Sequence, residues 1–245
     1  MRKELLLTIA AFAGACSRTQ VEPLPLATIP YLEPTPTTQA LFPEGISEAF
    51  QNQAGANFLG ILSQLSVHED PKISGIQEQL FSGQGSGGME ISTSIPILDE
   101  GGSPIKNEEA PLVCYFDERG VFVFVVNTNF FYFPNSQTPE SISARLYECL
   151  NFRAAIEEKY ISYLKTNPTI LLSDAIRLNP EWIEDSVLDA WYQTASDIVA
   201  PYREKMPAED SILVSLLHAF DTCGGDEDCF KQTILKNPGY ETLEI

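Results

Sequence analysis

The segment spanning residues 111–134 is the densest run of aromatic and β-branched residues in the chain, and it restricts what the sequence can fold into. Such residues favour the pleated, half-buried surface of a β-sheet. Two apolar runs, residues 112–116 and 121–126, are separated by the turn residues Asp117-Glu118-Arg119-Gly120, which predicts a β-hairpin. Because residues 121–126 are apolar on both faces, we expect them to form the central strand.

Two further strands complete the predicted sheet. Apolar and polar residues alternate over residues 89–98, which predicts a strand, and Pro96 places it at an edge or a bend. The aromatic run at residues 130–133 predicts the last strand, with Asn127-Thr128-Asn129 as the turn before it. We therefore expect a small antiparallel β-meander over about residues 89–133. Aromatic side chains on both faces of the last strand make that strand a candidate binding surface.

Helices are predicted on both sides of this sheet in the sequence. Before it, apolar residues at three- and four-residue spacing predict helices within residues 46–81, the first of them capped near Ser47. After it, Thr138-Pro139-Glu140 marks the start of a series of helices within residues 139–236. The predicted fold class is α+β, with the meander packed against helices and followed by a C-terminal helical bundle. We expect residues 45–245 to form a single domain.

The amino terminus has the pattern of an export signal. The basic residues Arg2 and Lys3 are followed by an apolar run that begins at Leu5 and is too short to span a bilayer. Residues 1–15 are therefore predicted to be a signal peptide. Residues 16–44 contain six prolines, a composition that predicts an extended, semi-rigid tether.

The segment Ala13-Gly14-Ala15-Cys16 resembles the lipobox of bacterial lipoproteins, in which small residues precede a cysteine that is lipidated and becomes the first residue. It departs from the family at Ala13, where Leu is usual. The resemblance implies a lipid on Cys16, contact with a membrane through that lipid, and a periplasmic or cell-surface location in the bacterial envelope. Ala13-Gly14-Ala15 also fits ordinary signal peptidase, and cleavage by that enzyme would give a soluble secreted protein.

Four cysteines remain besides Cys16, an even number that favours disulfides in an exported chain. Cys223 and Cys229 flank a glycine-rich acidic turn, so a local bridge is predicted between them. Cys114, on a strand, and Cys149, on the helix that follows the sheet, are then left to form the second bridge. The alternative for this second pair is two buried reduced thiols.

The acidic composition excludes one class of partner. The chain has 15 Lys and Arg residues against 34 Asp and Glu residues, a formal net charge of −19. Nucleic-acid binding depends on basic residues that neutralise phosphates, so no nucleic-acid partner is expected. Asp221, Asp226 and Asp228 are candidate calcium ligands, but their spacing is not that of an EF-hand. We favour Asp226 as a helix cap, and no cofactor is predicted.

The sequence contains no catalytic signature. Its only two histidines, His68 and His218, lie in no motif with the spacing of a triad or a metal site. The leading hypothesis is a lipid-anchored, non-enzymatic envelope protein that acts through protein contacts or as part of an assembly. The alternative is a secreted or anchored hydrolase whose site gathers dispersed residues, with His218, Asp221 and His68 as candidates.

Overall fold

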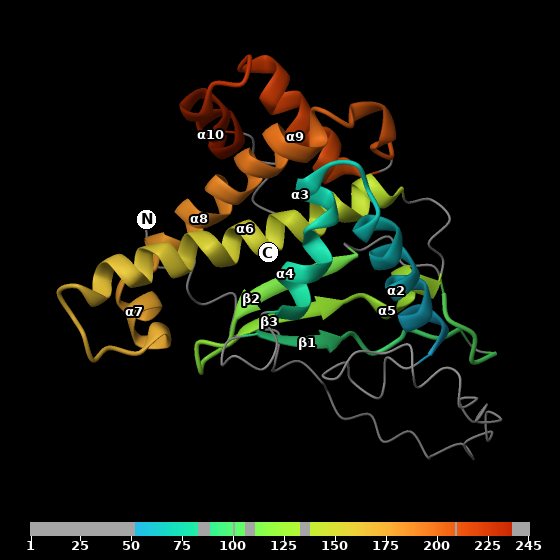
Figure 1. Cartoon of the computed structure of the whole chain (residues 1–245), viewed down its shortest axis with the longest axis horizontal. Coiled ribbons are helices and arrows are strands. Elements are labelled where there is room, and N and C mark those ends of the chain that lie inside the picture. The colour runs from blue at the N-terminus through green and yellow to red at the C-terminus, as the bar shows by residue number, and fades with distance from the viewer. Residues whose placement is uncertain are drawn as a thin grey trace, which may run out of the picture. The chain divides into compact units, whose positions relative to one another are not determined.

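The computed structural model describes residues 52–82, 89–99, 101–105, 111–132, 138–208 and 210–236. All of these residues belong to one compact unit, Pro34–Ile245. The described part of this unit combines a small sheet with many helices (Figure 1), which confirms the predicted α+β class. The predicted signal peptide and tether, residues 1–44, lie outside the described residues.

The sheet has the strand order β1-β3-β2 (Figure 1). Its strands are β1 (Met89–Thr93), β2 (Leu112–Phe116) and β3 (Phe122–Val126). β2 and β3 form the predicted antiparallel hairpin, with β3 as the central strand. β1 lies at an edge, as predicted, but pairs with β3 in parallel, so the sheet is mixed rather than wholly antiparallel. Thr93 and Leu112 both pair with Val126, so β1 ends and β2 begins at the same end of β3.

Helices fall within both predicted helical regions, and one more lies between them, in the segment predicted to form the last strand. They are α2 (Gln53–Ser66), α3 (Pro71–Ser74), α4 (Ile76–Ser82), α5 (Thr128–Tyr132), α6 (Pro139–Leu164), α7 (Leu172–Leu178), α8 (Glu181–Thr194), the π-helix η4 (Ala195–Val199), the 3₁₀ helix η5 (Arg203–Lys205), α9 (Ser211–Thr222) and α10 (Glu227–Lys236). The expected cap Ser47 lies outside the described residues. The side chain of Asn52 caps α2 instead, by accepting a hydrogen bond from the backbone N–H of Gly55 at 3.1 Å.

The prediction of a last strand in the meander is wrong, because that segment forms the helix α5. The side chain of Asn127 accepts a hydrogen bond from the backbone N–H of Phe130 at 3.2 Å, as a helix cap does. This local bond outweighs the strand preference of the aromatic residues. Phe131 is fully buried against Phe58 of α2, with ring centroids 5.1 Å apart. The aromatic side chain of Phe131 therefore belongs to the core, and no binding strand exists here.

The long helix α6 connects the sheet with the C-terminal helices. Thr138 and Ser141 form a capping box at its start, next to Pro139, where the sequence predicts a helix to begin. Phe152 of α6 packs against Phe116 and Phe122 of the sheet, with ring centroids 5.9 and 6.3 Å away. α6 also packs along α8 (Figure 1), so it is shared by the sheet layer and the helical layer.

Gly120 allows the β2–β3 turn to contact α7. It has a φ of +79°, and a Cβ added to it would lie 3.0 Å from the backbone nitrogen of Ser173 and 3.3 Å from Cβ of Leu172.

Gly120→Ala is therefore expected to lower the free energy of unfolding by about 2–3 kcal/mol, through backbone strain and the displaced contact. Urea unfolding measures the loss. Gly102, with the same φ and open space around it, is the matched control, and Gly102→Ala should cost only about 1 kcal/mol. Equal losses would show that the contact with α7 contributes nothing.

Candidate functional site

A hydrogen-bonded turn follows β1, and we call it the apolar hairpin (residues 94–99 and 101–105). Leu98 and Pro104 form an antiparallel bridge, and the N–H of Ile105 donates to the carbonyl of Ile97 at 3.1 Å. The carboxylate of Asp99 accepts hydrogen bonds from two backbone N–H groups inside the turn, at 2.8 and 2.9 Å. These bonds give the apolar hairpin a defined backbone conformation.

Asn129, near the start of α5, binds the backbone of the apolar hairpin, and its exposed fraction is only 1%. Its side-chain oxygen accepts from the N–H of Ile97 at 2.6 Å. Its side-chain nitrogen donates to the carbonyls of Ile97 and Ile105, at 2.7 and 2.8 Å. Thr128 adds two hydrogen bonds to Ser94, at 3.0 and 2.7 Å. A buried amide thus uses both of its donors and its acceptor to fix one surface turn.

Most side chains of the apolar hairpin face solvent. Four of them are large, apolar and exposed: Ile95 (89%), Ile97 (48%), Leu98 (44%) and Ile105 (40%). Single exposed apolar residues are normal on a protein surface, whereas several on one hydrogen-bonded turn make that turn a candidate interaction site. The turn directly continues the edge strand β1, which within the described residues pairs with β3 alone. An edge strand also presents backbone groups that another chain can pair with.

His68 lies in the turn between α2 and α3, where its ring is occupied by local contacts. Its Nδ1 accepts a hydrogen bond from the backbone N–H of Asp70 at 3.0 Å. The neutral ring therefore carries its proton on Nε2, which lies 3.9 Å from a carboxylate oxygen of Glu140. The ring also packs edge-on against Tyr202. With Nδ1 bonded to the backbone and the ring packed on Tyr202, the contacts of His68 are those of a structural residue.

Tyr147 and Asp197 form a second polar group, which joins α6 to the π-helix η4. The hydroxyl of Tyr147 donates to Asp197 at 2.8 Å, and Lys72 pairs with the other oxygen of that carboxylate. Burial raises the pKa of Tyr147 to about 12, and the hydrogen bond to Asp197 acts in the same direction. The phenol therefore stays protonated at neutral pH and serves as a hydrogen-bond donor, not as a nucleophile.

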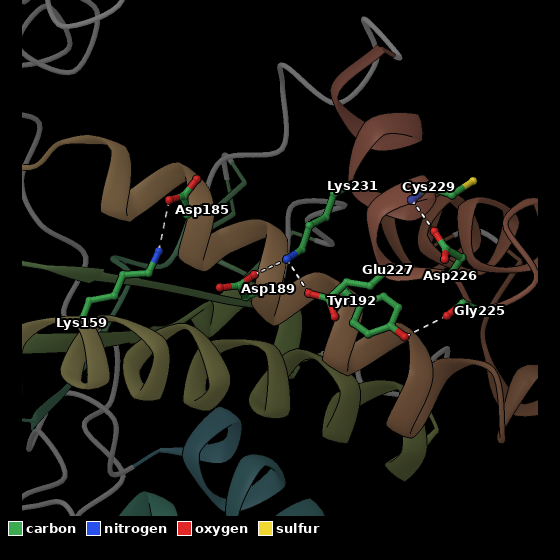
Figure 2. A network of polar contacts seen from close by, with 9 residues as sticks. All are labelled: Lys159, Asp185, Asp189, Tyr192, Gly225, Asp226, Glu227, Cys229 and Lys231. Carbon is green, nitrogen blue, oxygen red and sulfur yellow. Dashed lines mark hydrogen bonds and ion pairs between the residues drawn. The ribbon is translucent and has the colours of Figure 1, made fainter. Parts of the chain in front are cut away.

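The other candidate residues lie in the C-terminal helices. His218 is exposed on α9, and Asp221 forms an ion pair with Arg203 at 3.2 Å. Asp226 accepts a hydrogen bond from the N–H of Cys229 at 2.8 Å, as predicted for a helix cap (Figure 2), and Asp228 is exposed. In the ranges that the structure describes, no three His, Cys, Asp or Glu side chains are grouped so that they could hold a metal ion.

A buried ionic cluster joins α6, α8 and α9, and nothing in the sequence patterns pointed to it. Arg145 lies 3.3 Å from Glu148 and 2.6 Å from Asp210, and these three side chains are 7%, 11% and 8% exposed. Trp191 donates to the second oxygen of Glu148 at 2.7 Å. Asp210 also caps α9 through the N–H of Leu213. Both carboxylates are paired inside the protein, so the cluster links helices rather than offering a site to a ligand.

The structure contains both expected disulfides. Cys114–Cys149 ties β2 to α6, and Cys223–Cys229 closes the loop between α9 and α10. Disulfides persist in oxidising compartments, so the two bridges indicate an exported protein. Among the described residues, no helix is long and apolar enough to cross a membrane.

Comparisons of the chain with models of protein families, with curated proteins and with solved structures find no match.

Proposed function

We propose that the protein is a lipid-anchored component of the bacterial cell envelope that binds a protein partner and is not an enzyme. The exposed apolar side chains of the apolar hairpin are the observation that supports binding to a partner. The lipobox-like segment that ends at Cys16 supports the anchor, and the two disulfides agree with export. The Pro-rich composition of residues 16–44 suits a spacer between a lipid and a folded body.

The apolar hairpin meets two physical requirements of a recognition surface. Burying its four exposed apolar side chains in an interface would remove apolar area from water, at about 25 cal/mol per Å². Its backbone is fixed in advance by Asn129, so a partner does not have to order the turn. The formal charge of −19 favours a partner with a basic rim around its own apolar surface.

Photocrosslinking in the cell envelope tests the binding surface. A photoreactive amino acid in place of Ile95 is expected to give one discrete adduct with a protein partner, because Ile95 is 89% exposed on the apolar hairpin. The matched control is Leu178 of α7, which is 62% exposed and lies outside the hairpin. Immunoblots and mass spectrometry read out both adducts. Equal yields at the two positions, or no adduct at Ile95, would contradict the proposal.

The anchor is tested by Cys16→Ser. We expect the wild-type chain to incorporate a labelled fatty acid and to fractionate with membranes, and the variant to lose the label, because the lipid is attached through the cysteine sulfur. The variant should remain unprocessed or be shed. Gel fluorography of cells fed the labelled fatty acid gives the measurement. An unlabelled wild-type chain would favour a soluble secreted protein instead.

A further inference from the structure

The two disulfides differ in their access to solvent. Cys114 and Cys149 are 2% and 5% exposed, between the sheet and α6. Cys229, in contrast, is exposed, and Cys223 is partly exposed. An attacking thiolate must reach a sulfur atom before it can exchange with a disulfide, so access decides which bridge reacts in the folded protein. Only the Cys223–Cys229 bridge offers an exposed cysteine.

Contacts other than the disulfide also hold the loop and α10 in place. Tyr192 of α8 donates to the carbonyl of Gly225 at 2.8 Å, and Lys231 of α10 pairs with Asp189 of α8 (Figure 2). Phe230 of α10 is fully buried in the core. The bridge closes a loop between residues only six apart in sequence, so its loop-closure contribution is about 2 kcal/mol. α10 therefore stays in place when the bridge is open, and the two thiols stay close enough to be reoxidised.

The surface around Cys229 is acidic. Asp226, Glu227 and Asp228 precede it directly, and all three are exposed. The nearest cation on the same helix, Lys231, is already paired with Glu227 and Asp189 (Figure 2). This negative surface repels anionic thiols and attracts cationic ones, an effect that salt screens.

We propose that Cys223–Cys229 is a redox-active disulfide, which exchanges with a thiol reductant that carries positive charge around its sulfur. The thiolate of the reductant attacks Sγ of Cys229 and forms a mixed disulfide, while Sγ of Cys223 leaves as a thiolate. A second reductant thiol attacks the mixed disulfide and releases Cys229. The reductant is oxidised to its disulfide by loss of two electrons, and its two thiol protons are transferred to Cys223 and Cys229. In the cell, a dithiol protein with a basic surface around its thiols meets this description.

The test uses the purified full chain without denaturant, with cysteamine as the cationic thiol and mercaptoethanesulfonate as the anionic thiol. Reactions run at equal thiolate concentration, and mass spectrometry after maleimide labelling locates the free thiols. Among the four bridged cysteines, we expect two labelled residues, Cys223 and Cys229. We also expect cysteamine to react at least about threefold faster at low ionic strength, with the difference lost near 1 M salt.

A charge variant provides the control. Asp226→Asn combined with Asp228→Asn removes two negative charges but keeps a good helix cap, because Asn caps helices as well as Asp. The preference for cysteamine should fall in this variant, while the labelled positions stay the same. The proposal is overturned if Cys114 and Cys149 are labelled first, if no thiol appears, or if both thiols react at the same rate with the wild-type chain.

Discussion

Arg145→Met lowers the free energy of unfolding by about 3–5 kcal/mol, the usual loss when one partner of a buried ion pair is removed. Arg145 is the cation shared by Glu148 and Asp210. Met fills a similar volume, so the loss comes from two buried carboxylates left without their positive partner. Asp210 would still cap α9 through Leu213, and Glu148 would still accept from Trp191, but neither bond replaces the lost charge.

Urea unfolding followed by circular dichroism measures this loss, with both disulfides oxidised. Arg177→Met is the matched control, because Arg177 pairs with Asp174 on the surface and its side chain is 78% exposed. A surface pair of this kind contributes at most about 1 kcal/mol, so the control should stay near the wild type. Similar losses in the two variants would show that the buried cluster does not tie α6 to α9.

A second large loss in the free energy of unfolding is expected when Cys114→Ala is combined with Cys149→Ala. The bridge joins residues that are 35 apart in sequence, and the chain-entropy relation gives about 4 kcal/mol for opening a loop of that length. Both sulfur atoms also pack in the core, at the contact between β2 and α6. The corresponding double variant at Cys223 and Cys229 opens a loop between residues 6 apart in sequence. Its free energy of unfolding should fall by only about 2 kcal/mol.

Thermal unfolding of the two double variants, measured side by side at one pH, compares these losses. A larger loss at Cys223 and Cys229 would mean that the exposed bridge, rather than the buried one, holds the fold together. The same result would also count against a redox-active Cys223–Cys229 bridge, because opening it would then unfold the chain.

Local chemistry made part of this structure predictable. The β2–β3 hairpin follows from two apolar runs around the turn residues that end in Gly120, whose φ of +79° suits glycine. The start of α6 follows from Thr138 and Pro139, and the start of α10 follows from Asp226. In each case the residues that determine the feature lie within a few positions of one another, so their spacing in the sequence is informative.

The features that the sequence did not predict depend on residues far apart in the chain, or on two local preferences that compete. The aromatic run after β3 favoured a strand, but the cap formed by Asn127 made it the helix α5. The parallel pairing of β1 joins it to a strand that is not its neighbour in the sequence. Arg145 and Asp210 are 65 residues apart, and in the sequence each is an ordinary charged residue of a helical region.

At the candidate site, the role of Asn129 also depends on residues far away in the sequence. As a single residue it was predicted to be part of a turn, whereas the structure buries it and joins its side chain to segments 24 and 32 residues away. Ile95 and Ile97 were expected to lie within the strand predicted over residues 89–98. Their presentation on a fixed turn depends on this one buried amide, which no periodicity in the sequence indicates.

If Asn129 shapes the apolar hairpin for recognition, the crosslink from position 95 should depend on its side chain, and an Asn129→Asp background tests this dependence. Asp keeps the acceptor for Ile97 N–H but loses both donors, so the carbonyls of Ile97 and Ile105 lose their hydrogen bonds to residue 129. Asn57→Asp is the control, because Asn57 donates to the carbonyl of Phe131 in α5 and forms no hydrogen bond with the hairpin. We predict that the adduct falls at least about fivefold in Asn129→Asp, as expected when roughly 1 kcal/mol of preorganisation is lost. It should persist in Asn57→Asp; an undiminished adduct in Asn129→Asp would contradict the claim.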